Sequence, residues 1–352
     1  MSQLDSRQQT PVFPLEIFGI IIEIIARSSP NYPSLGSDEL EKLAACSLTC
    51  SSLHELCRRQ IFRSVSIRFN SHSGKKLLRL MGILKAKPVI KTEIVDVFVS
   101  LLSSDWDQKK FNKLKRNAHH PSTFPAVQRL RIVDGNTFTE GGRYHARPAG
   151  CPEFAQNFCR ELIESYTKLP TLRFFYNRYN FRARDIPYIA LGCPTLQLTD
   201  LHLLDIGESK DAKLLSSFKV PPLKQLKRLT IENCTPAFLC ILSQTTSVLD
   251  LTISGKFEKL KTLPTPVCKL EVLKLDPDDR SEDNGLSPAF DLLWQTNRLG
   301  FKPISTLKNL SVGVIAPEDL STLNKMFAEL RQLQSLTING GPHASFLDYR
   351  NF

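Results

Sequence analysis

The stretch LKQLKRLTIENC, residues Leu223 to Cys234, decides how this chain folds. Its apolar residues Leu226, Leu229 and Ile231 follow one pattern: apolar, two residues, apolar, one residue, apolar. Side chains alternate between the two faces of a strand, so Leu229 and Ile231 point to the same side. The polar residues Glu232 and Asn233 follow directly after Ile231. The pattern predicts a short strand with one buried face.

The same pattern returns along the chain, and the middle positions of successive copies are separated by roughly 22 to 45 residues. One blurred copy lies around Leu172 and Phe175. The clear copies are Phe62, Val65, Ile67; Ile94, Val97, Val99; Val127, Leu130, Ile132; Leu198, Leu201, Leu203; Leu226, Leu229, Ile231; Val248, Leu251, Ile253; Leu270, Leu273, Leu275; Leu307, Leu310, Val312; and Leu333, Leu336, Ile338.

The copies from Leu201 to Leu273 come nearest to the spacing of roughly 20–29 residues that is typical of leucine-rich repeats, in which each unit buries its apolar face only against its neighbours. Cys234 stands where the repeat expects Asn or Cys after the strand. Helix-like pieces at 153–169 and 317–333 lie between copies. We therefore expect an α/β fold: an irregular leucine-rich-repeat solenoid with parallel strands on its concave face and helices on its convex face. An ordinary α/β domain with parallel strands is the alternative.

The block from Val12 to Ile67 reads instead as three short amphipathic helices that end in a strand. The first is predicted to begin at Pro14. Capping boxes at Asp38 with Glu41, and at Ser52 with Glu55, predict the other two. The first helix carries an apolar stripe of Ile17, Ile20, Ile21, Ile24 and Ile25, with Phe18 and Ile22 outside it. So small a block carries more apolar surface than it can bury, which favours a docking module for another protein.

No catalytic or cofactor motif is present, because the sequence lacks G-x-S-x-G, a Walker loop, H-E-x-x-H and a dinucleotide fingerprint. The nine cysteines form no C-x-x-C pair, and Cys46, Cys50 and Cys57 are spaced as helix-packing thiols. The acidic stretch 276–285 fails as a calcium loop, because Asn284 replaces the glycine and Phe290 the closing glutamate. We expect no enzyme, no cofactor and no metal.

The net charge of +11 and the isoelectric point of about 9.2 leave nucleic acid open as a partner. The excess is densest from Lys109 to Arg116, followed by His119 and His120, although a solvated surface is the simpler interpretation. No segment resembles a signal peptide or is long enough to cross a bilayer. We expect a soluble protein of the cytoplasm or nucleus that does not enter membranes.

The helical block resembles the F-box family. The resemblance rests on the opening phrase from Phe13 to Phe18, on LAACSLTC at 43–50, and on the closing Ile61, Phe62 and Arg63. The phrases look particularly like those of F-box proteins of basidiomycete fungi, which often carry degenerate leucine-rich repeats. Two departures stand out: Leu53 replaces a common tryptophan, and the loop from Pro30 to Gly36 is longer than usual.

The resemblance implies a substrate adaptor of an SCF-type (Skp1–cullin–F-box) ubiquitin ligase. Residues 12–63 would dock a Skp1-like adaptor, residues 64–345 would bind a protein target, and 1–11 and 346–352 would be tails. The contact residues that it implies are Phe13, Pro14, Leu15, Ile17, Leu43, Ala44, Cys46, Leu48 and Leu53, some of which must pack the block instead. The alternatives are a non-catalytic repeat scaffold that the block merely caps, and a basic nucleic-acid-binding protein.

Overall fold

The fold is that of a computed structural model. It describes residues 14–27, 37–68, 73–100, 124–134, 161–165, 169–176, 191, 197–204, 223–233, 241–255, 257, 260, 265–277, 286–313 and 319–338. The basic run at 109–116, His119, His120, the loop at 30–36, both tails and most of the acidic stretch lie outside these residues.

Three helices begin the described chain: α1 (Leu15–Arg27), α2 (Ser37–Ser47) and α3 (Ser51–Ile61). α1 starts one residue after Pro14, whose carbonyl accepts the Ile17 N–H at 3.0 Å. The predicted capping boxes at Asp38 and Ser52 are both wrong, because α2 already begins at Ser37 and α3 already begins at Ser51. The start of α3 has a different cap. Its N-cap is Cys50, whose sulfur accepts the Leu53 N–H at 3.5 Å.

Ten strands form one sheet in which every neighbouring pair is parallel and the spatial order equals the chain order. This confirms the predicted α/β class with parallel strands, and the open sheet has the layout of a solenoid. The strands are β1 (Ser64–Arg68), β2 (Asp96–Ser100), β3 (Arg129–Asp134), β4 (Thr171–Tyr176), β5 (Asp200–Leu204), β6 (Arg228–Glu232), β7 (Asp250–Gly255), β8 (Val272–Pro277), β9 (Asn309–Val312) and β10 (Ser335–Ile338).

The pairing register aligns the middle residue of each sequence copy with the middle residue of the next. Nine of these residues are at most 5% exposed, and only Leu336, on the last strand, is more open at 43%. The aligned ladder is Val65, Val97, Leu130, Leu172, Leu201, Leu229, Leu251, Leu273, Leu310 and Leu336.

The blurred fourth copy is in fact regular. Phe174, not Phe175, pairs with Leu203 of β5, and the fully buried Leu169 supplies the first position. The copy therefore reads Leu169, Leu172, Phe174 with the standard spacing, and a second phenylalanine directly after it obscured the pattern.

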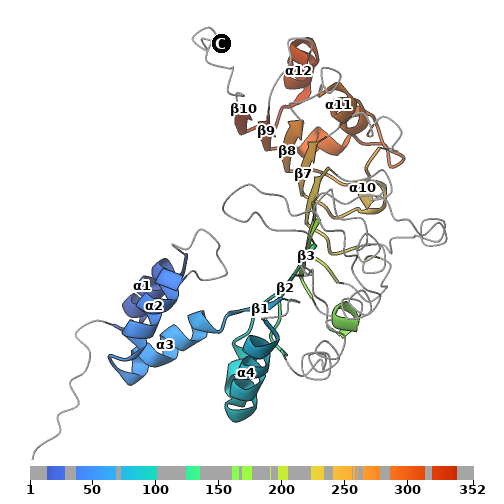
Figure 1. Ribbon diagram of the computed structural model, residues 1–352. Coiled ribbons are helices and arrows are strands. Elements are labelled where there is room, and N and C mark those ends of the chain that lie inside the picture. Colours follow the sequence, from blue (N-terminus) through green and yellow to red (C-terminus); the bar gives the residue numbers. More distant parts are fainter. Residues whose placement is uncertain are drawn as a thin grey trace, which may run out of the picture.

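Helical segments lie between the strands: α4 (Ser73–Ala86), η1 (Pro88–Thr92), α10 (Ile241–Gln244), α11 (Ser287–Trp294), η4 (Pro303–Thr306) and α12 (Asp319–Glu329). The strands follow an arc, and α10, α11 and α12 lie on its outer side (Figure 1). Of the two predicted outer helices, α12 falls within 317–333, and residues 161–165 are helical within 153–169. No helix among the described residues is both long and apolar enough to span a bilayer.

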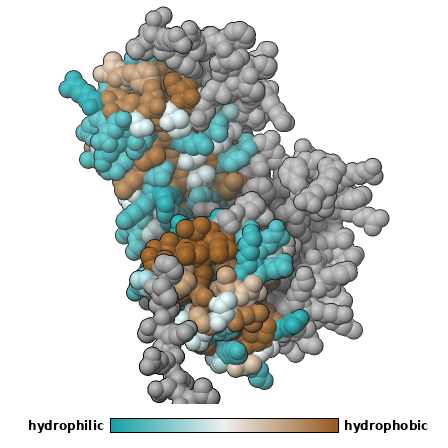
Figure 2. Space-filling model, turned by 90° about the vertical axis from the view of Figure 1, so that its left-hand side faces the viewer, coloured by the Kyte–Doolittle hydropathy of each residue, from teal (hydrophilic) through white to brown (hydrophobic). Residues whose placement is uncertain are grey.

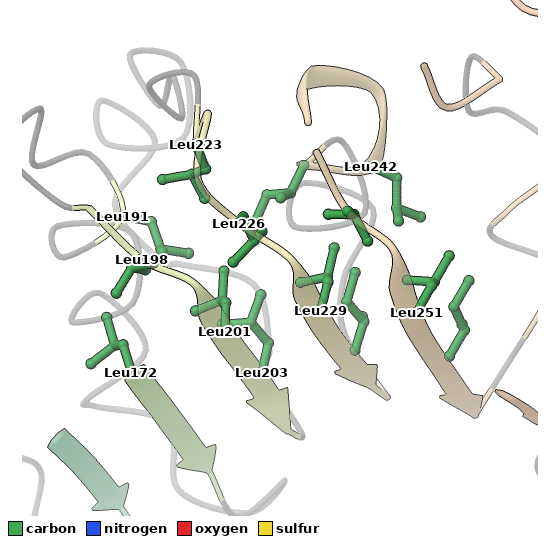
Figure 3. Packing of buried hydrophobic residues seen from close by; sticks show 14 of the residues in the cluster. Leu172, Leu191, Leu198, Leu201, Leu203, Leu223, Leu226, Leu229, Leu242 and Leu251 are labelled. Atoms are coloured by element: carbon green, nitrogen blue, oxygen red, sulfur yellow. The ribbon is translucent and has the colours of Figure 1, made fainter. Parts of the chain in front are cut away.

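One core runs the length of the sheet, between the strands and the outer segments. Leucines from successive strands project to the same side and stack against the residues of the connecting segments (Figure 3). No single repeat encloses its own leucines, so each repeat depends on its neighbours for burial.

Candidate functional site

The helical block has a small core of its own, separate from that of the sheet. Ile22 and Ala26 of α1, Leu43 of α2 and Cys57 of α3 are at most 3% exposed and form this cluster. Half-buried side chains packed around it are Ile25, Cys46, Leu53, Leu56 and Ile61. With so few buried residues, the block leaves much of its apolar surface uncovered.

The uncovered apolar surface lies mainly on α1, which has two apolar faces. The inner face, with Ile22, Ile25 and Ala26, packs into the block. The opposite face is exposed to between 43% and 62% and consists of Ile17, Ile20, Ile21 and Ile24, here named the outer α1 stripe. Leu15 lies on the same side of the helix as Ile22 but is exposed in the first turn. Figure 2 views the molecule from the side on which the block lies and shows a hydrophobic patch there. An apolar stripe of this kind typically marks a protein-docking surface.

The contact residues implied by the family resemblance divide into two groups. Pro14, Leu15, Ile17 and Ala44 are exposed, and Leu48, at the end of α2, is 86% exposed. These side chains are available to a partner.

The other group points inward. Leu43 is completely buried, and Cys46 and Leu53 are half-buried against the same small core. These three side chains therefore pack the block itself. Phe13 lies outside the described residues.

Ile20, Ile21 and Ile24 are not among the contact residues that the family resemblance implies, although the structure exposes all three. The signal was present, because Ile17, Ile20, Ile21 and Ile24 recur at helical spacing. The inner residues recur at the same spacing, so periodicity alone does not say which face is buried.

The cysteines of the block behave as packing and capping groups. Burial, together with a smaller effect of nearby Cys46 and Cys50, raises the pKa of the Cys57 thiol to about 11. Within the described part of the chain, no group of three or more His, Cys, Asp or Glu side chains is arranged to hold a metal ion.

Arg58 of α3 joins the block to the sheet. Its Nη2 lies 2.6 Å from Glu93 Oε1, and its Nε is 3.2 and 3.3 Å from the two oxygens of the same carboxylate. Glu93 follows η1 and precedes β2, and Glu55 holds the guanidinium from the other side at 2.8 Å. The hydrogen bond to Glu93 raises the pKa of Arg58. The side chains of Arg58 and Glu93 are only 17% and 9% exposed, so the pair is well shielded from water.

On the face of the sheet opposite the core, charged side chains form rows that cross the strands, and the carboxylates of Asp96 and Asp200 in these rows are themselves buried. The leading row, the position just before each buried middle residue, pairs Asp96 with Arg129 and Asp200 with Arg228 on adjacent strands. Burial raises the pKa of Asp96, and Arg129, Arg131 and Arg63 act against that rise. Acidic and basic groups thus largely neutralise each other along the leading row.

No family model matches this chain, and no curated protein matches it. Among solved structures, the one described as "Crystal structure of Rad7 and Elc1 complex in yeast" matches with a TM-score of 0.35 and 10% sequence identity. The match covers 91% of this chain and 81% of that chain. Similarity at this level says nothing about what this chain binds.

Proposed function

We propose that this chain is the substrate-recognition subunit of an SCF-type ubiquitin ligase in the cytoplasm or nucleus. In this proposal α1–α3 act as an F-box that docks a Skp1-like adaptor, and through it a cullin-RING ligase. The sheet is a degenerate leucine-rich-repeat domain that holds a target protein. The chain itself performs no chemistry, and the partner proteins transfer ubiquitin.

The outer α1 stripe is the observation that carries this proposal. Fully burying a leucine or isoleucine contributes ~1.5–3 kcal/mol, so several half-exposed aliphatic side chains on one helix face can supply substantial binding energy. Interfaces commonly depend on a few such anchors. Leu48, the most exposed large apolar side chain among the described residues, adds a further anchor at the end of α2.

The separate core of the block favours a docking module over a simple cap. A cap is expected to merge its apolar residues with the end of the solenoid core, but Ile22, Ala26, Leu43 and Cys57 form their own cluster. The ion pair between Arg58 and Glu93 fastens the block to the sheet, which favours the competing hypothesis that the block is only a cap on a repeat scaffold. That hypothesis has one weakness. It gives the outer α1 stripe no partner.

Co-purification of the full chain with a Skp1 protein tests the proposal. The test variant is Ile20→Asp/Ile24→Asp on the outer α1 stripe. The matched control is Leu299→Asp, because Leu299 is as exposed as these residues but lies beyond α11 at the other end of the chain. Unfolding curves by circular dichroism verify that all three proteins fold.

We expect wild type and Leu299→Asp to retain Skp1, and Ile20→Asp/Ile24→Asp to lose at least about tenfold in affinity, or ~1.4 kcal/mol. A folded wild type that retains no Skp1 contradicts the docking function. Equal retention by all three proteins contradicts the role of the stripe.

A further inference from the structure

The last strand of the sheet, β10, does not enclose its aliphatic side chains as the other strands do. Its middle residue, Leu336, is 43% exposed, whereas the equivalent residues of the other nine strands are at most 5% exposed. Leu333 and Ile338 of the same copy are only half-buried. Figure 2 also shows hydrophobic surface at the upper end of the molecule, where β9, β10 and α12 lie in Figure 1. The core of the sheet is therefore open at β10.

The opposite end of the sheet is closed. β1 is also an edge strand, yet its inward-facing residues Val65 and Ile67 are buried. The helix α4 lies against β1 and contributes the completely buried Leu84 to the same core (Figure 1). Within the described ranges, no strand pairs with the outer edge of β10 and no helix follows it.

The backbone of β10 is open at the same place as its side chains. The Ser335 N–H donates to the Lys308 carbonyl at 3.0 Å, on the side of β9. Successive residues of a parallel strand direct their N–H and C=O groups to alternate edges, so those of Leu336 face away from β9. Charged residues or proline usually protect such an edge, but β10 reads SLTI and contains neither. An edge of this kind is a template for pairing with another extended chain.

The rest of the sheet indicates what kind of chain fits this edge. At each of the nine strand pairs, the inward-facing residues of one strand align with inward-facing residues of the next, and these side chains are aliphatic or phenylalanine. A chain that covers β10 in the same way is extended and carries apolar side chains at alternate positions.

We infer that the outer edge of β10 binds an extended segment of a target protein that has aliphatic side chains at alternate positions. The part of this inference that calls the ligand a target rests on the proposed function. The segment adds a strand to the sheet: its backbone pairs with the outward N–H and C=O of Leu336, and its aliphatic side chains cover the Leu336 side chain.

A second copy of this chain fits the edge less well than a linear segment. Stable interfaces bury about 800 Å² on each partner, whereas a strand of four residues is only roughly 13 Å long. Each copy also carries a net charge of +11, so two copies repel each other. A linear segment needs no more than the edge itself.

Fluorescence anisotropy with the full chain and labelled peptides tests the inference. The probe is the peptide QLKRLTIEN, which has the sequence of residues 225–233 and so contains the strand that covers β5. The control peptide exchanges Thr230 and Ile231, which keeps the composition but places Leu229 and the isoleucine on opposite faces. Both peptides are basic like the chain, so attraction between opposite net charges does not explain binding.

Four variants of the chain separate the edge from its surroundings. Leu336→Lys places a charge on the open end, and Leu249→Lys is its matched control, because Leu249 is 39% exposed and directly precedes the interior strand β7. Leu336→Ala and Leu336→Pro both remove the aliphatic side chain, but only proline also removes the outward N–H. Unfolding curves by circular dichroism verify that each variant folds.

We expect wild type to bind QLKRLTIEN at least ten times as tightly as the control peptide. Leu336→Lys should weaken that binding at least tenfold and Leu249→Lys less than twofold. Leu336→Pro should weaken it at least threefold more than Leu336→Ala, because strand pairing uses the backbone. Equal binding of the two peptides, or equal losses in the two lysine variants, overturns the inference; these two comparisons decide it if Leu336→Pro does not fold.

Other occupants of the edge give different results. A folded wild type that does not bind QLKRLTIEN overturns the inference. Sedimentation velocity that shows a wild-type dimer, and a monomer for Leu336→Lys, assigns the edge to a second copy and also overturns it. Slow hydrogen exchange of the Leu336 amide in the free monomer assigns the edge to the chain's own residues, with the same consequence.

The two proposals fail separately. Leu336→Lys is expected to retain a Skp1 protein, and Ile20→Asp/Ile24→Asp is expected to retain QLKRLTIEN. Peptide binding without Skp1 binding supports the β10 edge and contradicts the ligase assignment. Skp1 binding without peptide binding contradicts the β10 edge alone.

Discussion

The helical block and the parallel sheet use the same aliphatic side chains in opposite ways. In the sheet, the middle residues of nine successive strands are almost completely buried. In the block, α1 exposes one row of isoleucines and buries another. The sheet uses its aliphatic residues for its own stability, whereas the block keeps a large share of them at its surface.

The difference follows from how each region encloses its core. Each strand of the sheet gains neighbours from the next repeat, so every added repeat covers the apolar face of the one before. Three short helices cannot enclose both faces of α1, because their combined surface is large relative to the volume inside. An aliphatic residue is therefore a stability determinant in the sheet and a binding determinant on the outer face of α1.

The largest expected effect on stability comes from comparing a buried leucine of the sheet with an exposed isoleucine of the block. Leu251→Ala removes a fully buried side chain in β7 and is expected to lower the free energy of unfolding by about 2–5 kcal/mol, through lost burial and the cavity left behind. Ile24→Ala, at 62% exposure, is expected to change it by less than about 0.5 kcal/mol. Urea-induced unfolding measures both, and similar losses would show that the outer α1 stripe is structural.

A smaller effect is expected at the joint between the regions. Arg58→Met leaves the shielded Glu93 carboxylate without its guanidinium and is expected to cost about 1–3 kcal/mol. Arg59→Met is the matched control, because Arg59 is 62% exposed and lies 3.4 Å from Glu55. The control should change stability by less than about 1 kcal/mol. In Arg58→Met, but not in Arg59→Met, amide hydrogen exchange should become faster in α1–α3 and change less in β6–β8. An equal increase of the exchange rate in both regions would mean that the block and the sheet unfold as one unit.

The smallest expected effect on stability concerns the ionisation of one buried thiol in each region. Burial raises the pKa of Cys57 in the block and of Cys268 in the sheet core from 9.0 to about 11. Between pH 9 and about pH 11, the thiol is ionised in the unfolded chain but still protonated in the folded chain. Ionisation in this range therefore favours the unfolded chain. Each thiol is expected to lower stability by up to about 1.4 kcal/mol per pH unit in that window.

The thiol contributions are separated from those of other groups by substitution. The stability difference between wild type and Cys268→Ala, and likewise Cys57→Ala, is measured by urea unfolding from pH 8 to pH 11. Both differences should shrink as the pH rises above about 9. A constant difference would show that the thiol keeps its ordinary pKa in the folded chain.

The ten strands and their register were predictable from the sequence. Each copy of the pattern places two side chains on one face, and a parallel sheet with no insertions inside its strands must align equivalent positions. The fourth copy was missed because Phe174 and Phe175 both fit a hydrophobic pattern, and only the pairing with Leu203 distinguishes them. The beginning of α3 was missed because Ser52 and Glu55 match a capping box, while the Cys50 sulfur is the group that caps the helix.

The exposed surface was less predictable than the strands. Leu43 and Leu48 lie five residues apart in α2 and the turn after it, yet one is completely buried and the other is 86% exposed. Nothing in their chemistry separates them. The ion pairs of the leading row are also invisible in the sequence, because Asp96 and Arg129, like Asp200 and Arg228, are far apart in the chain and meet only through the strand pairing.

The sequence by itself determined the elements and their order, because the strand and helix periodicities and the spacing of the repeats are local properties of the chain. The tertiary structure alone decided which face of α1 is open, which predicted contact residues are buried in the block, and which charges stand side by side on the sheet. The physical reason is that burial and electrostatic pairing depend on neighbours distant in the chain, and a periodic pattern specifies a face without specifying what covers it.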